Sequence, residues 1–104
     1  MEITIGNVTY PMRASMRAWR KFENNTGVKV AEVDASDVTL IPGLIFYFVE
    51  EGCEHNGMKF TMDVDKWLSK IEVGDLPMLV DAMTEAMGGK QEDKKKPKMK
   101  GETL

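Results

Sequence analysis

Apolar and polar residues alternate over the first twelve positions of the chain, and this alternation predicts a β-hairpin. The Gly6-Asn7 pair suits a two-residue turn with a positive φ at its first position. Such a turn pairs strand positions 5 with 8 and 3 with 10, so that one face collects most of the apolar side chains. The residues of that face are Met1, Ile3, Ile5, Val8, Tyr10 and Met12.

From Pro11 the apolar period changes to three or four residues, which predicts an amphipathic helix that ends at Gly27. The apolar stripe of this helix is Met12, Met16, Trp19 and Phe22. The opposite face carries the basic stripe Arg13, Arg17, Arg20 and Lys21. This basic stripe is a candidate electrostatic contact with an acidic partner, although any amphipathic helix also needs a solvated face.

An apolar run from Val38 to Val49 follows, and its aromatic and β-branched residues favour a strand by composition alone. The run is too long for a typical strand, and rows of apolar residues recur at intervals of four. We therefore expect a helix that is buried on several sides. Asp34 or Ser36 is its expected N-cap, and Pro42 is expected in its first turns or at a kink.

Two further helices are predicted. Residues 63–73 have the apolar stripe Val64, Trp67, Leu68 and Ile71, with Asp63 or Thr61 as the cap. Residues 75–87 have the stripe Leu76, Val80, Met83 and Met87, with Asp75 as the cap and Gly88-Gly89 as the end. The predicted fold class is α+β and mainly helical: an N-terminal β-hairpin followed by about four α-helices.

The chain has 104 residues, enough for one domain, which we expect over residues 1–88. Residues 1–87 hold eight Lys or Arg against fourteen Asp or Glu, a net charge of −6. Residues 89–104 are rich in Lys and lack apolar periodicity, so a disordered tail is predicted there. An acidic body argues against nucleic acid as the main ligand.

The residue pattern contains no motif that indicates catalysis or the binding of a metal or cofactor. Cys53 and His55 are the sole cysteine and histidine, and a zinc site needs three or four suitable ligands. No phosphate-binding loop or nucleophile motif is present. We therefore expect a protein that is not an enzyme, with no catalytic, cofactor-binding or metal site. The single cysteine, and the lack of an export signal or membrane span, predict a cytoplasmic location and no membrane partner.

Apolar side chains are in excess of what two short strands and three other helices are expected to cover. Nine methionines contribute to this excess, and flexible thioethers suit adaptable binding surfaces, although methionines also fill cores. We therefore predict a protein interface, with self-association as a further option. The predicted interface residues are Leu44, Phe46, Tyr47, Met78, Met83 and Met87.

The order of elements over residues 2–88 resembles the tail assembly chaperones of long-tailed phages and prophages. The resemblance rests on the hairpin that ends in "TYPMR", the segment "RASMRAWRKFENNTGVKV", the apolar helix closing in "FVEEG", and "DVDKWLSKIEVGDLPMLVDAMTEAM". It implies a non-catalytic protein of the bacterial host cytoplasm that binds the helical tape measure protein, and in some cases tail tube subunits, during virion assembly. Two alternatives stay open: a structural tail or head-tail component of the virion, and a small nucleic-acid-binding regulator.

Overall fold

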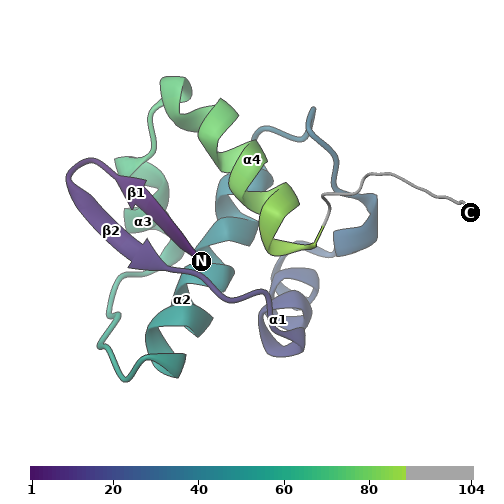
Figure 1. The fold of residues 1–104 in the computed structure, drawn as a ribbon. Coiled ribbons are helices and arrows are strands. Elements are labelled where there is room, and N and C mark those ends of the chain that lie inside the picture. Colours follow the sequence, from purple (N-terminus) through teal and green to yellow (C-terminus); the bar gives the residue numbers. More distant parts are fainter. Residues whose placement is uncertain (89–104) are drawn as a thin grey trace, which may run out of the picture.

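The computed structural model describes residues 1–88, so the predicted tail at 89–104 lies outside the described residues. The described part contains a two-stranded sheet and four α-helices, which confirms the predicted fold class. The strands are β1 (Glu2–Ile5) and β2 (Val8–Pro11), and the helices are α1 (Met16–Thr26), α2 (Ile41–His55), α3 (Val64–Lys70) and α4 (Leu76–Ala86). Two short 3₁₀ turns, η1 (Val30–Glu32) and η2 (Val73–Asp75), precede α2 and α4. Figure 1 shows their arrangement.

The hairpin has the predicted register, with Ile3 opposite Tyr10 and Ile5 opposite Val8. Gly6 has a φ of 62°, which the turn requires and glycine adopts without strain. Ile3, Ile5 and Tyr10 are buried, whereas Val8 remains 48% exposed near the turn. The hairpin therefore packs one apolar face on the helices, as the alternation predicted.

Helix α1 begins later than the sequence pattern predicted. Its first residue is Met16, and the side chain of Ser15 caps it by accepting a hydrogen bond from the amide of Ala18. Pro11 therefore ends β2, and Met12 is buried beyond the strand rather than on the helix. Because the helix buries Ala18 and Phe22, Met16 points away from the core and is 75% exposed. The predicted cap at Gly27 is confirmed by its left-handed conformation.

The apolar run forms α2, so the choice of helix over strand is confirmed. Pro42 lies in the first turn, as predicted, but no side chain caps this helix. The predicted caps instead close a separate turn, in which the amide of Ser36 donates to Asp34 and the amide of Asp34 donates to Asp37. The prediction of Asp34 or Ser36 as the cap of α2 was therefore wrong.

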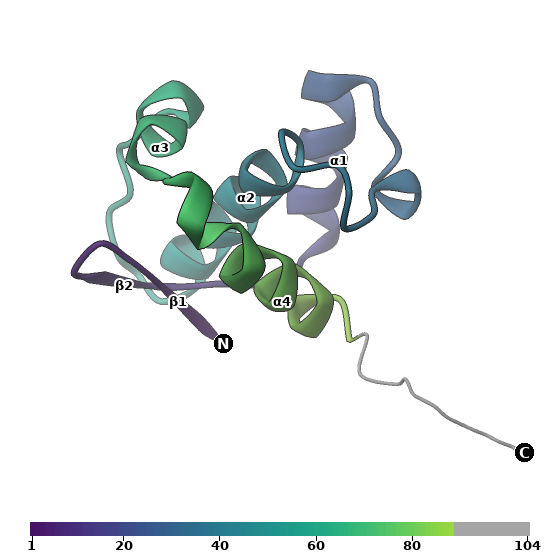
Figure 2. The same ribbon diagram turned by 90° about the horizontal axis from the view of Figure 1, so that it is seen from above.

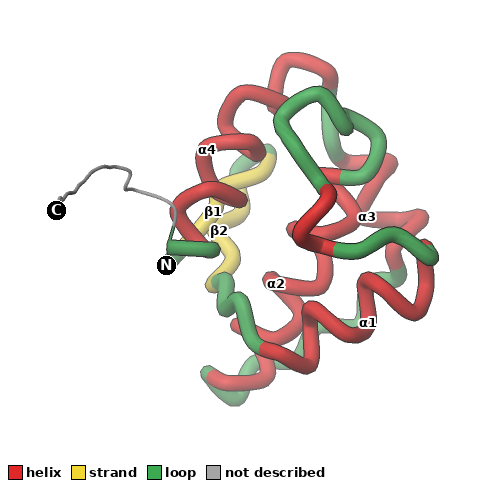
Figure 3. Tube along the Cα trace, turned by 90° about the vertical axis from the view of Figure 1, so that its right-hand side faces the viewer, coloured by secondary structure: helices red, strands yellow, loops and turns green. Residues whose placement is uncertain are grey.

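Helix α2 occupies the centre of the described structure. Figure 2 shows it with α1 on one side and α3 on the other, and Figure 3 shows α1 running beside it. Both α1 and α4 pack along α2, and the hairpin and α3 cover the rest. As a result α2 is buried on several sides, from Ile41 to Cys53.

The last two helices are shorter than predicted, and one apolar stripe is rotated. Asp63 caps α3 as expected, but the helix ends at Lys70, so Val73 lies in η2 and not on the helix. Asp75 occupies the N-cap position of α4, as predicted, but its carboxylate makes no capping hydrogen bond to that helix. It accepts instead from the amide of Glu72, at 2.9 Å. Helix α4 buries Leu79, Ala82 and Met83, a face shifted from the predicted stripe.

Candidate functional site

An ionic network joins α1 to α2. Glu51 is a charged residue on α2 with only 3% of its surface exposed, and it accepts hydrogen bonds from Ser15 (2.8 Å) and from Nε of Arg17 (2.6 Å). The same arginine donates to Glu54 one turn later (2.6 Å). A buried carboxylate is stable only when it is paired in this way. The network therefore fixes the position of α1 along α2.

The pKa of Glu51 reflects two opposing effects. Burial alone would raise this pKa, but the hydrogen bonds from Arg17 and Ser15, with the charges of Arg17 and Lys21, outweigh burial. The pKa of the Glu51 carboxyl is therefore held below its ordinary value, and Glu51 stays ionised at neutral pH.

The predicted basic stripe is divided by these contacts. Arg17 pairs with Glu51, as described above, and Lys21 pairs with Glu50 at 3.0 Å. Arg13 and Arg20 are exposed, and neither forms an ion pair with a described residue. Two of the four residues thus hold the fold together, and the other two remain at the surface.

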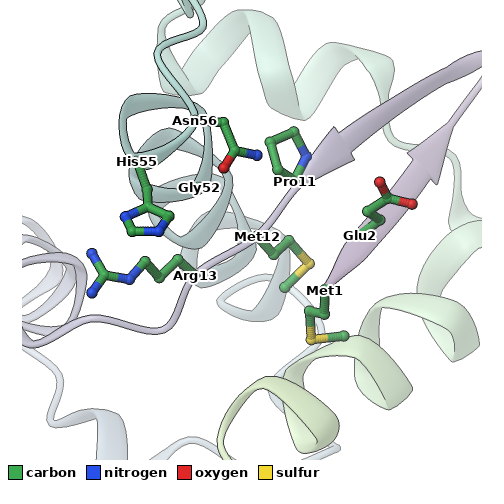
Figure 4. Close-up of a pocket in the computed structure, with 8 residues that line it drawn as sticks. All are labelled: Met1, Glu2, Pro11, Met12, Arg13, Gly52, His55 and Asn56. Carbon is green, nitrogen blue, oxygen red and sulfur yellow. The ribbon is translucent and has the colours of Figure 1, made fainter.

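A hollow of about 360 Å³ lies where the hairpin meets the end of α2. Figure 4 shows Arg13 and His55 beside each other on one side of it, with Glu2 on the other. Gly52 lies where α2 approaches the backbone of Pro11 and Met12 most closely. The polar groups of this hollow do not converge on one point, so their arrangement does not define a ligand site.

The six predicted interface residues do not form one exposed surface. Leu44 (0% exposed), Phe46 (5%) and Met83 (7%) belong to the core. Tyr47 and Met78 are half-buried, and Met87 is the one exposed residue of the six, with 37% of its surface accessible. The expectation that α2 has uncovered faces at Leu44 and Phe46 was wrong, because both side chains are buried in the core. On Phe46, α3 and the segment before it provide the cover. The rings of Phe60 and Trp67 lie 5.6 and 6.3 Å from that of Phe46.

An apolar groove of about 320 Å³ is present elsewhere, between the start of α2, the end of α3 and the start of α4. Three of its side chains are exposed: Val73 (83%), Val38 (44%) and Leu68 (38%). The residues that line this apolar groove are Val38, Thr39, Pro42, Leu68, Ile71, Glu72, Val73 and Leu76. This groove is the strongest candidate for a binding surface on the described residues.

The apolar groove exists because two helices begin or end where the sequence pattern predicted continuation. Ending α3 at Lys70 places Val73 on a 3₁₀ turn, where it has no core to contact. Beginning α2 at Ile41 leaves Val38 in the preceding turn. Leu68, Ile71 and Leu76 were predicted on the apolar stripes of two helices, so this surface was not predicted. A usable signal was Val73 itself, an isolated valine between Glu72 and Gly74.

Residues 1–88 contain no group of three or more His, Cys, Asp or Glu side chains placed to hold a metal ion. Cys53 is buried, and burial raises the pKa of its thiol, which keeps the sulfur protonated. No helix in the described part of the chain has the length and apolar character to cross a bilayer.

Comparisons of the chain with protein-family models, with curated proteins and with solved structures find no match.

Proposed function

We propose that this protein is a tail assembly chaperone of a long-tailed phage or prophage. In this role it acts in the host cytoplasm, binds helical segments of the tape measure protein, and hands them to tail tube subunits. The observation that supports the proposal best is the apolar groove, with Val73 83% exposed. An isolated exposed valine is ordinary, but three exposed apolar side chains from three elements around one groove are typical of a protein-binding site.

The shape of the apolar groove supports a helical client. Its walls are the end of α3 and the turn before α4, and its floor includes Pro42 at the start of α2. A groove with apolar walls accepts the apolar stripe of an amphipathic helix, with contacts at intervals of three or four residues. Because a chaperone must release its client, a shallow groove with few anchors suits this function better than a deep one.

The ion pairs of α1 weaken the alternative of a nucleic-acid-binding regulator. A nucleic-acid site gains its affinity from several cations facing phosphates. Arg17 and Lys21 already face carboxylates of α2, and the described body carries an excess of acidic residues.

Co-expression with the tape measure protein tests the proposal. The tape measure gene from the same gene cluster is expressed alone and with this chain, and the soluble fraction of its product is measured. We expect the chain to raise that fraction and the variant Val73→Asp to abolish the effect. Met16→Asp is the matched control, because Met16 is 75% exposed but lies on α1, outside the apolar groove. No gain in solubility from the unaltered chain would contradict the proposal.

Purified particles distinguish the proposal from the alternative of a structural virion component. A chaperone leaves before the tail is finished, so we expect mass spectrometry of mature particles to find no peptides of this chain. Stoichiometric amounts in the particles would instead support a structural role.

A further inference from the structure

The charged residues around the apolar groove are mostly acidic. Glu72 lines the groove, and Asp75 lies one turn further, next to Leu76. Asp65 precedes Leu68 by three residues on α3, so the two lie on the same face of that helix. None of the eight lining residues is basic. A partner in this groove therefore meets a negative border on an apolar floor.

The lysines of α3 do not cancel this border. Lys66 lines a different hollow, together with Tyr10 and Phe60. Lys70 follows Lys66 by four residues, which places it on that same side of the helix.

Backbone hydrogen bonds hold part of this acidic border in place. The carboxylate of Asp75 accepts from the amide of Glu72 at 2.9 Å, and that of Asp37, beside Val38, accepts from the amide of Asp34 at 2.9 Å. An ionised carboxylate offers about four acceptor positions, so both can still bind a partner's ammonium or guanidinium group. Fixed carboxylates lose less side-chain entropy on pairing than mobile ones.

The size of the apolar groove favours one helical segment over a second copy of the chain. Three large apolar side chains are exposed around the groove, and its volume is about 320 Å³. A standard stable interface between two folded proteins uses roughly 20–30 residues on each side. A single helix can fill the groove with two or three apolar residues, whereas a folded partner would need surface well beyond it.

We propose that the apolar groove selects amphipathic helices whose apolar stripe is flanked by Lys or Arg. This inference rests on the proposed function, because it defines which segments of a long helical client are bound. The apolar side chains of the segment contact Val73, Val38 and Leu68, and its basic side chains face Glu72 and Asp75. Segments with the same stripe and acidic flanks are rejected by like-charge repulsion.

Three model peptides test this selection by fluorescence anisotropy with the full chain. The first two share one leucine stripe at helical spacing and carry either Lys or Glu at the remaining polar positions. The third keeps the Lys residues but has Gln in place of the leucines. At low ionic strength we expect the Lys peptide with the stripe to bind about tenfold more tightly than the Glu peptide. This difference should shrink at about 0.5 M salt, where exposed charges are screened.

Charge-reversal variants locate the effect. Glu72→Lys should reduce the preference for the Lys peptide by about fivefold or more, because it places a cation in the apolar groove. Glu85→Lys changes the net charge equally at the other end of α4 and should leave the preference unchanged. Equal effects of the two variants would mean that the overall acidity of the body is responsible, and would overturn the inference.

The remaining outcomes separate this inference from the proposed function. Equal binding of the Lys and Glu peptides, or equal binding of the Lys peptide without leucines, overturns the charge selection. Absence of binding by all three peptides also overturns it, even if co-expression still keeps the tape measure protein soluble, in which case the chaperone function stands. Selective binding of the Lys peptide without any effect on the tape measure protein supports the groove's selectivity and contradicts that function.

Discussion

The two sides of α2 are covered by different kinds of interaction. On the α1 side, Arg17 donates one hydrogen bond to Glu51 and one to Glu54, and the backbone of the segment before α1 lies against Gly52. On the α3 side, the contacts are aromatic and apolar, and the apolar groove is left at one end. Charged pairs and close backbone contacts require a fixed geometry, whereas apolar packing tolerates an unfilled end. The difference teaches that the α1 side determines the shape of the domain, while the α3 side has room for a partner.

The largest effect is expected from Gly52→Ala, which would break the α1 side. A Cβ at this position would lie 2.7 Å from the backbone nitrogen of Met12, and the carbonyl of Pro11 is nearer still. Because backbone atoms cannot move aside cheaply, we expect a loss of about 3 kcal/mol in the free energy of unfolding, measured with urea.

Gly43→Ala is the matched control in the same helix. A Cβ on Gly43 has no neighbouring atom within 4 Å, so this variant should be unchanged or more stable by up to about 1 kcal/mol. Similar losses in both variants would mean that α2 does not approach the hairpin as described.

The second effect concerns the α3 side. Trp67 is fully buried, and its indole nitrogen donates to the carbonyl of Pro42 at 2.9 Å. Trp67→Phe removes this hydrogen bond and leaves a small void, and we expect a loss of about 2 kcal/mol in the free energy of unfolding.

Trp19→Phe is the control on the α1 side. Its indole donates to Glu23 from a half-buried position, so a loss below about 1 kcal/mol is expected. The reverse order in urea unfolding would contradict the packing of α3.

The third effect tests the ionic network. Glu51→Ala leaves Ser15 and Arg17 without their buried acceptor, and we expect a loss of about 2 kcal/mol at pH 7. Glu50→Ala removes only the partly exposed pair with Lys21 and should cost about 0.5 kcal/mol or less. Equal losses would show that the buried carboxylate has no special part in joining the helices.

The same network predicts a pH dependence. The pKa of Glu51 is lower in the folded chain than in the unfolded chain, so its stabilising contribution is complete above the unfolded pKa. That contribution is lost as the pH falls below the ordinary glutamate pKa and through the lower pKa of the folded chain. We therefore expect the stability difference between the unaltered chain and Glu51→Gln to shrink between pH 7 and pH 3. A constant difference over this range would contradict an ionised, paired Glu51.

The smallest effect on stability is expected at the apolar groove. Val73 is 83% exposed, so Val73→Asp should change the free energy of unfolding by no more than about 0.5 kcal/mol. The same variant is expected to lose client binding, which separates a binding surface from a core position. A large loss of stability would place Val73 in the core and remove the groove.

Sequence patterns predicted the elements well and their ends less well. The turn at Gly6, the caps at Asp63 and Gly27, and the helical nature of α2 follow from local chemistry, and all are confirmed. The predicted start of α2 was wrong because Asp34 and Asp37 close a separate turn before it. The predicted start of α1 was wrong because it depends on a distant contact. The segment after β2 is held by the amide of Arg13, which donates to the carbonyl of Phe48 at 2.9 Å.

The candidate site was harder to predict than the fold. An apolar stripe identifies which residues avoid water, but it does not say whether the same chain covers them. Phe46 is covered by Phe60 and Trp67, which are distant in sequence, whereas Leu68 is left 38% exposed because α3 ends soon after it. The pairing of Arg17 with Glu51 was likewise invisible, since 34 positions separate these residues.

The buried thiol of Cys53 can report how often the end of α2 opens. It is the single thiol of the chain, and it lies in the last turn of α2 with 1% of its surface exposed. It therefore reacts only when that turn separates from its neighbours. The rate of thiol labelling in buffer therefore measures how often the central helix is uncovered. A bound segment that bridges α2, α3 and α4 should slow this labelling without touching the sulfur.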